Sequence, residues 1–438
     1  MVNLFAPVFM PNLRTEVPSA FRGTQGFYAS QSSALGSAIH ANNRSSKEGT
    51  IAPLKSFIES LKSLPRPAWV LFGGTFINRF GTFVMPFLAI YMAGNGFTAA
   101  QAGLAISSYG GGHVIASMLG GHLADRIGRR HTIALSMFAS AAAMLALSQA
   151  RTFPMILVLA FVTGTCAELY RPAAAALLTD LVPPEKRMLA FGLYRFAINL
   201  GFAAGPATAG FLANKSFFYL FAGDAITSFL YGIVALVALP HGVRSIAKDE
   251  TKDEGLRVAL RHRVFVYFLA ATLCLTWVEF QLHSTFPLHI ANSGYSPSTY
   301  GMLISLNGLL IIVFELLITA WTQRLAPQPL IAVGYALTGI GIALTGLATN
   351  IQLLAATVVI WTIAEMVYAP ASGAYVSILA PERYRGRYMG LYHSMFSAGM
   401  VLGPAIGTWI YGRNPAALWW TCLIVGLAGG ALALVKPK

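Results

Sequence analysis

Long stretches without any charged residue dominate this sequence. The runs Ala99–Gly120 and Thr132–Ala150 contain no Asp, Glu, Lys or Arg, and the short charged segment Gly121–Arg130 lies between them. About 20 apolar residues are enough for a helix to cross the hydrocarbon core of a bilayer. Each run is therefore predicted to span a membrane, and the segment between them is predicted to be a tight loop at its surface.

Composition supports a membrane protein and excludes an ordinary soluble one. Only 11% of the residues are charged and 56% are hydrophobic, whereas soluble domains carry about 25% charged residues. The net charge of +14 comes from basic residues that lie mainly in loops between apolar runs, a pattern that sets membrane orientation. Nucleic-acid binding is therefore not expected. The three cysteines, Cys166, Cys274 and Cys422, lie inside apolar runs without metal-ligand spacing, so no metal or other cofactor is expected.

The chain divides into a polar extension, two membrane bundles and a linker. Residues 1–67 are predicted to be disordered, because they are rich in Ser, Ala, Asn and Gly and show no strong periodicity; an organellar transit peptide is the alternative. The bundles are predicted at 68–240 and 263–438, with a cytoplasmic linker at 241–262. The twelve expected spans lie near 68–92, 101–123, 132–150, 153–181, 188–213, 217–240, 263–291, 298–323, 329–348, 351–380, 387–411 and 415–435.

Lys and Arg in the short loops predict the orientation. Most of these residues fall on one side of the spans, whereas the other side holds only Arg151, Lys215 and Arg413. The side rich in Lys and Arg is expected to be cytoplasmic. We therefore expect a monomeric multi-pass protein of the lipid bilayer, in the plasma (inner) membrane with both termini in the cytoplasm. An organellar membrane is the alternative if residues 1–67 are a transit peptide.

The two halves repeat at a fixed offset of 198 residues. Gly192, Gly201 and Gly205-Pro206 recur as Gly390, Gly399 and Gly403-Pro404. Two like halves related by a parallel repeat are known in secondary transporters.

The segment Gly121–Arg130 resembles the signature loop of the major facilitator superfamily, which reads Gly, any residue, Leu-Ala-Asp-Arg, any residue, Gly and two basic residues. This resemblance implies an all-α membrane protein with twelve transmembrane helices in two pseudo-symmetric six-helix bundles. It also implies that the loop latches the cytoplasmic side shut, with Asp125 facing the start of the eleventh span. The expected gating residues are Gly121, Asp125, Arg126, Gly128, Arg129 and Arg130.

The fifth span resembles the antiporter motif of the same family. Its expected helix-packing residues are Gly192, Gly201, Gly205, Pro206 and Gly210, with Ala209 replacing one motif glycine. Glycines let helices approach closely and proline bends them. In the family this pattern is associated with export in exchange for protons, although the eleventh span carries nearly the same pattern, so packing alone is an alternative explanation.

Ionisable residues inside apolar runs are costly and usually functional. The resemblance implies that the first, fourth, seventh and tenth spans line a central cavity. Arg79 is expected to pair with Glu168, with Arg171 competing for the same carboxylate, whereas a carboxyl without a cation favours its protonated form in a dry cavity. The alternative is that these groups form static pairs that fix packing, and Arg195 is expected to extend toward the membrane surface. The expected substrate and proton pathway comprises Asn78, Arg79, Glu168, Arg171, Glu279, His283 and Glu365.

These features predict a secondary active transporter that works by alternating access on a small-molecule substrate. Resemblance to the drug:proton antiporter branch favours proton-coupled efflux of small amphipathic compounds. A proton-coupled uptake symporter for a small polar or anionic metabolite is the alternative, because Arg79, Arg171 and His283 suit an anion. A non-transporting receptor or scaffold is the alternative from another class. No nucleophile elbow, phosphate loop or His-x-x-x-His motif is present, so the chain is not expected to be an enzyme.

Overall fold

The computed structural model describes residues 61–241 and 252–435. The predicted disordered extension and the central part of the predicted linker thus lie largely outside the described residues. The chain divides into two units, residues 1–65 and 66–438, and the helices below belong to the second unit.

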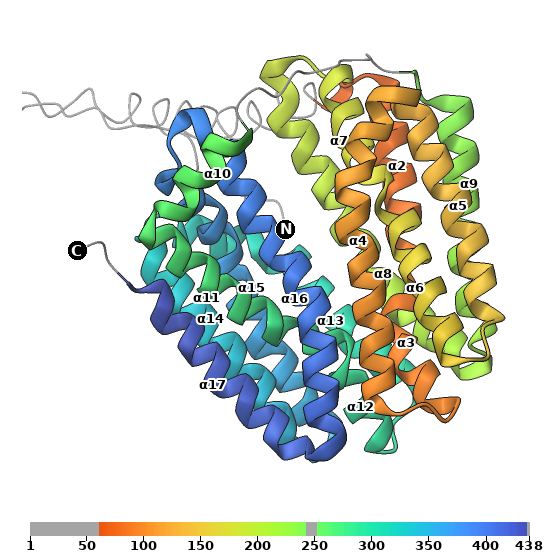
Figure 1. The fold of residues 1–438 in the computed structure, drawn as a ribbon, viewed down its shortest axis with the longest axis vertical. Coiled ribbons are helices and arrows are strands. Elements are labelled where there is room, and N and C mark those ends of the chain that lie inside the picture. Colours follow the sequence, from red (N-terminus) through yellow and green to blue (C-terminus); the bar gives the residue numbers. More distant parts are fainter. Residues whose placement is uncertain (1–60, 242–251, 436–438) are drawn as a thin grey trace, which may run out of the picture. The chain divides into compact units, whose positions relative to one another are not determined.

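The first six spans form one bundle, which Figure 1 shows in red to yellow-green. Its elements are α2 (Arg66–Phe80), α3 (Val84–Gly94), α4 (Ala99–Ile127), α5 (Arg129–Ser148), α6 (Phe153–Glu168), α7 (Tyr170–Leu181), η1 (Pro184–Lys186), α8 (Arg187–Lys215) and α9 (Phe218–Ala238).

The remaining helices form the second bundle, shown in green to blue (Figure 1). Its elements are α10 (Lys252–Arg261), α11 (Arg263–Glu279), η2 (Phe280–His283), α12 (Thr285–Asn292), α13 (Pro297–Thr322), α14 (Pro327–Leu344), η3 (Thr345–Leu347), α15 (Ile351–Leu379), η4 (Glu382–Tyr384), α16 (Arg385–Arg413) and α17 (Pro415–Ala433). Helix α10 lies inside the predicted linker at 241–262 and packs against α11 and α16. The division into two bundles and a linker stays a prediction.

Ten helical segments of the described residues are long and apolar enough to cross a membrane. Helices α4 and α16 are not among them, although each has 29 residues. These two helices pack against each other between the bundles, where Gly110 lies against Met400. A helix that faces protein needs less apolar side-chain surface than one that faces lipid. With these two, the fold has the twelve spans that the sequence predicts.

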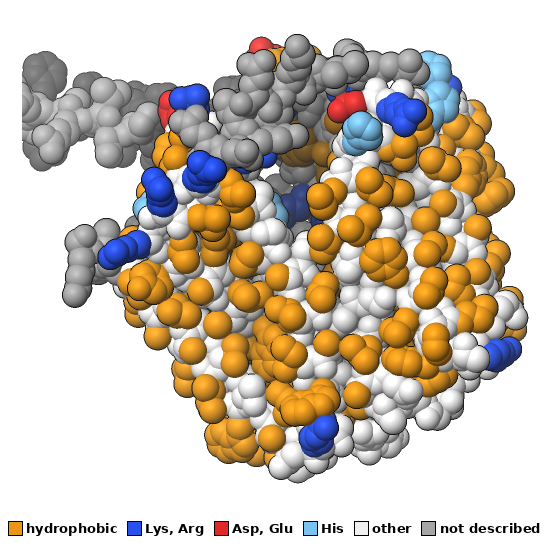
Figure 2. Space-filling view, viewed as in Figure 1, with side chains coloured by type: hydrophobic (Ala, Val, Ile, Leu, Met, Phe, Trp, Pro, Cys, Tyr) orange, Lys and Arg blue, Asp and Glu red, His pale blue; other side chains and the backbone are white. Residues whose placement is uncertain are grey.

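The outer surface is apolar between two polar ends. Lys and Arg gather at one end in Figure 2, and we call this the basic end. It is the end at which α4 ends and α16 begins. Exposed apolar residues such as Val158, Leu316 and Ile424 cover the helices between the two ends. A lipid bilayer accommodates such a surface because every helix satisfies its own backbone hydrogen bonds.

Three spans are interrupted near their centres. Helices α2 and α3 are separated by residues 81–83, α6 and α7 meet at Leu169, and η2 separates α11 from α12. At the second break the Ser136 hydroxyl donates to the Cys166 carbonyl (2.5 Å) and accepts from the Tyr170 N–H (3.0 Å). The hydroxyl thus takes the place of a backbone hydrogen bond, as expected where a side chain enters a helix.

The predicted surface loop is shorter than its sequence suggests. Helix α4 continues to Ile127 and α5 begins at Arg129, so only Gly128 lies between them. Gly128 has a φ of +91°, which glycine adopts without steric cost. The prediction of a loop over Gly121–Arg130 is therefore wrong in extent, because charged residues at a helix end are solvated there without ending the helix.

The offset of 198 residues is visible in the backbone. Gly96 and Gly294, which are related by this offset, have φ values of +83° and +80°. Gly128 corresponds instead to Ala326, whose φ is −63°. The two halves therefore share one turn geometry and differ in the other.

Candidate functional site

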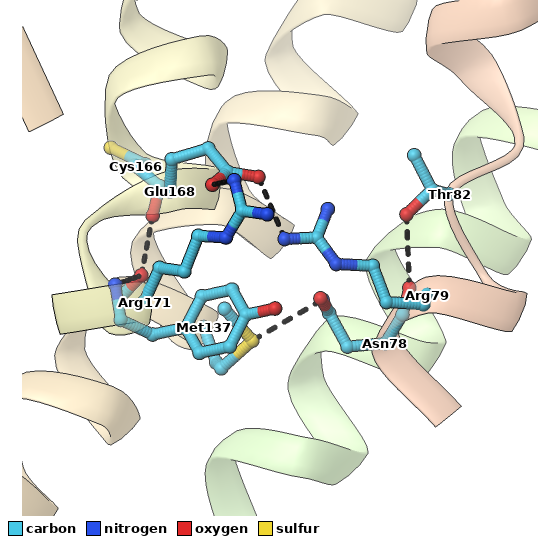
Figure 3. A network of polar contacts seen from close by, with 9 residues as sticks. Asn78, Arg79, Thr82, Met137, Cys166, Glu168 and Arg171 are labelled. Carbon is cyan, nitrogen blue, oxygen red and sulfur yellow. Dashed lines mark hydrogen bonds and ion pairs between the residues drawn. The ribbon is translucent and has the colours of Figure 1, made fainter. Parts of the chain in front are cut away.

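A buried ion-pair cluster lies where α2 and α6 end. The Arg79 Nη2 atom is 2.8 Å from Glu168 Oε1, and both side chains are less than one-tenth exposed. Arg171 Nη1 is 3.3 Å from the other carboxylate oxygen, Oε2, and its side chain is 58% exposed. Figure 3 shows both guanidinium groups converging on this carboxylate. The two arginines therefore share Glu168, and the cluster carries one net positive charge.

Aromatic rings and a helix surface surround the buried arginine. The Arg79 guanidinium lies 5.6 Å from the Tyr170 ring centre and 5.8 Å from that of Phe202, distances at which a cation is attracted to the ring face. The neighbouring Asn78 side chain donates to Met137 Sδ at 3.4 Å and lies beside the cluster in Figure 3. Arg79 is thus held from the span α6–α7 and from α8.

A cavity in the structure contains two carboxyl groups. It has a volume of about 260 Å³, and Glu279, His283 and Glu365 all line it; we call it the acidic pocket. Tyr368 donates a hydrogen bond to Glu279, and Asn307 donates to Glu365 at 3.0 Å. Among the described residues neither carboxyl group forms an ion pair. The other side chains that line the acidic pocket are mostly apolar, including Phe202, Ile304, Ile311 and Trp361.

A wider cavity of about 1310 Å³ lies between α4 and α16, on the half of these helices nearer the basic end. We call it the vestibule. His113, Arg171 and His393 line it, and Figure 2 shows this face hollowed between the bundles toward the basic end. Toward the opposite end the same two helices are in contact, as at Gly110 and Met400. The described conformation is therefore open toward the basic end and closed at the other.

The structure gives the expected gating residues different surroundings. Asp125 and Arg126 are exposed, and within the described ranges neither forms an ion pair. Arg129 instead pairs with Asp180 of α7, and Arg130 donates to the Leu239 carbonyl at 3.5 Å. Among the described residues no ion pair joins Asp125 to α16 in this conformation, and the expected gating contact stays a prediction. Gly121 likewise faces open space, because a β-carbon there would have no neighbour within 4 Å among the described residues.

Three motif glycines of α8 lie at helix contacts. A β-carbon on Gly205 would come 2.6 Å from the Phe80 carbonyl oxygen, and one on Gly210 would come 2.7 Å from the Ser298 α-carbon. Gly201 faces Arg79 in the same way. Pro206 lies inside α8, beside Gly301 of α13. Gly192 has open space around it, so the motif packs α8 through its other members.

Several polar contacts of the site were missed from the sequence. Arg195 pairs with Glu315 of α13 at 3.0 Å, a partner that the sequence did not predict. Tyr368 and Asn307 hold the two carboxyl groups of the acidic pocket. A polar Asn inside the apolar span 298–323 was the available signal for Asn307. The recurrence of Tyr170 as Tyr368 at the offset of 198 residues was the available signal for Tyr368.

Transport proteins of known sequence or structure are similar to this chain. The chain is 25% identical to a Na(+), Li(+), K(+)/H(+) antiporter of Planococcus maritimus, over 81% of this chain and 91% of the relative. It is 24% identical to the quinolone resistance protein NorA of Staphylococcus aureus, over 84% of this chain and 96% of the relative. A solved structure of the nucleoside transporter NupG has the same fold, with a TM-score of 0.72 and 14% identity over 84% of this chain and 98% of that one.

These relatives are transporters. The predictions that the chain is a transporter, that it resembles antiporters and that it is not an enzyme are therefore confirmed for the general class of protein. The sequence model of the Major Facilitator Superfamily matches residues 71–292 and 271–438. Together with the fold, this match shows that the chain is a multi-pass membrane protein that belongs to the major facilitator superfamily.

Proposed function

We propose that this protein exports small amphipathic compounds in exchange for protons, by alternating access across the plasma (inner) membrane. The observation that carries the proposal is the acidic pocket, in which Glu279 and Glu365 lie among apolar side chains without a paired cation among the described residues. An ionised carboxyl group in such surroundings is costly unless a counter-charge arrives.

Protons and cationic groups of a substrate are the two counter-charges available to these carboxyl groups. Binding of one makes binding of the other unnecessary, so the two compete for the same site. Competition at a single site that is open to one side at a time produces exchange. Apolar residues such as Trp361 and Ile304 suit the remaining surface of an amphipathic compound.

The proposed direction follows from the conformation and the charge pattern. The vestibule opens toward the basic end, and excess Lys and Arg mark the cytoplasmic side of membrane proteins. The described state is thus the one that would take substrate from the cytoplasm, with both termini on that side. The similarity to NorA and to a cation/proton antiporter supports the same direction. We further propose that the protein acts as a monomer in the bilayer.

Proton-coupled uptake of an anionic metabolite is a second candidate. The observation that favours it is Arg171, whose 58% exposed side chain lines the vestibule beside His113. Guanidinium has five N–H donors, and Glu168 uses part of them. An anion could bind there, although Glu279 and Glu365 would then serve only for protons.

Transport in proteoliposomes that contain an internal pH dye tests the proposal. Lipophilic cations and small organic anions are added to wild type, Glu279→Gln, Glu365→Gln and the control Arg413→Gln, whose side chain stacks on Trp409 at the opposite end. Proton movement opposite to the cation, lost in both Glu variants and kept in the control, is expected. Proton movement in the same direction as an anion would support uptake instead. Unchanged coupling in both Glu variants would contradict the role of the acidic pocket.

A further inference from the structure

The acidic pocket and the vestibule are adjacent and have opposite charge. Phe280 of η2 and Phe396 of α16 line both cavities, so these two rings form the boundary at which the cavities meet. On one side of the rings lie Glu279 and Glu365, and on the other lies Arg171.

The acidic pocket alone is small for a whole substrate. Its volume is about 260 Å³, whereas sites that enclose drug-sized ligands usually measure about 300–1,000 Å³. The vestibule on the other side of Phe280 and Phe396 has about 1310 Å³. A compound with one group in the acidic pocket must therefore extend past the two rings into the vestibule.

The vestibule offers donors for an anionic group at that point. Glu168 is compensated by both Arg79 and Arg171, so the cluster has a net positive charge. Arg171 contacts Glu168 through Nη1, and its exposed side chain leaves further N–H donors toward the cavity. His113 and His393 also line the vestibule, and no acidic residue other than Glu168 is close to this wall of the cavity among the described lining residues.

We propose that the preferred substrates are amphipathic zwitterions. Their amine would occupy the acidic pocket beside Glu279 and Glu365, their apolar middle would lie between Phe280 and Phe396, and their carboxylate would bind Arg171. This inference rests on the proposed function and narrows its substrate class. A guanidinium group matches a carboxylate in geometry as well as charge, so Arg171 discriminates zwitterions from simple cations.

Three matched probes test this proposal. Ciprofloxacin carries an amine and a carboxylate, its ethyl ester keeps only the amine, and its N-acetyl derivative keeps only the carboxylate. Binding of each to purified protein and the proton movement that each drives in proteoliposomes are measured for wild type, Arg171→Gln, Glu365→Gln and Arg413→Gln. Size-exclusion profiles and melting temperatures establish that each variant is folded.

Wild type is expected to bind ciprofloxacin about tenfold more tightly than either derivative. Arg171→Gln should reduce ciprofloxacin binding to the level of the ester and leave ester binding unchanged, whereas Glu365→Gln should weaken both. The zwitterion proposal would be overturned if the ester bound as tightly as ciprofloxacin, or if Arg171→Gln weakened the binding of both compounds equally. In either case, proton exchange driven by the ester would leave the proposed function standing. Absence of proton movement with all three probes would overturn both.

Discussion

Gly201 of α8 lies against Arg79 of α2, so closely that a β-carbon on Gly201 would come 2.7 Å from the Arg79 β-carbon. The helix-packing motif and the buried ion pair are therefore parts of one arrangement. The missing side chain at Gly201 lets α2 approach α8 near the end of α2, and this approach places the Arg79 guanidinium on Glu168.

Replacing Gly201 by Ala should therefore destabilise the protein and reduce transport. Overpacking of a close contact typically costs about 1–3 kcal/mol, because the α2 backbone has little room to move. Gly192→Ala is the matched control, since its α8 position has no neighbour within 4 Å. Melting temperatures in detergent and transport rates measure both. Equal stability of the two variants would contradict the contact.

Removing Arg79 alone should be more harmful than removing it together with Glu168. Arg79→Met leaves a buried carboxylate with only the partly exposed Arg171, and breaking a buried pair costs about 3–5 kcal/mol. Arg79→Met with Glu168→Met should recover most of the stability, because neither charge remains uncompensated. Transport should stay lost in the double variant. Recovery of transport there would show that the pair only fixes packing.

The Arg195–Glu315 pair should influence conformation more than stability. Arg195 is 63% exposed, and pairs of this kind contribute about 0–1 kcal/mol. Arg195→Glu places two acidic groups on the facing surfaces of α8 and α13 and should drive these helices apart. Spin labels on the two helices measure their separation. Arg195→Glu combined with Glu315→Arg should restore the wild-type separation. An unchanged separation in both variants would indicate that the pair has no conformational role.

The contact expected of Asp125 should form only when the vestibule is closed. Cysteines at Gly121 and Gly390 report closure, because neither position has a neighbour within 4 Å among the described residues in the open conformation. In a background without Cys166, Cys274 and Cys422, cross-linking should be slow at rest and faster when substrate and a pH gradient drive turnover. Asp125→Asn should abolish the increase. Fast cross-linking at rest would contradict an open basic end.

A side chain at Gly96 or at Gly294 should destabilise the protein. Their φ values of +83° and +80° lie in a region where a β-carbon costs about 1–2 kcal/mol. Gly96→Ala and Gly294→Ala should lower the melting temperature, and their effects should add because the turns belong to different halves. Gly94→Ala, at a helical position with open space, is the control and should not destabilise the protein.

Sequence alone determined the parts of this protein that depend on local order along the chain. Long apolar runs predicted all twelve spans, because crossing a bilayer requires a certain length of apolar helix. The offset of 198 residues identified the two halves. Its charge inside an apolar run singled out Arg79, and resemblance to a family motif singled out Gly201. Neither observation gave a contact between them.

Tertiary structure alone decided which side chains meet. The hydrogen bond of Tyr368 with Glu279 and the Arg195–Glu315 pair join spans that are 89 and 120 residues apart. Such contacts depend on how helices rotate and approach one another, and apolar helices in a membrane present similar faces in many orientations. The same reason explains the shared boundary at Phe280 and Phe396: charge signs are visible in the sequence, whereas their separation across one continuous cavity arises only when the two bundles pack together.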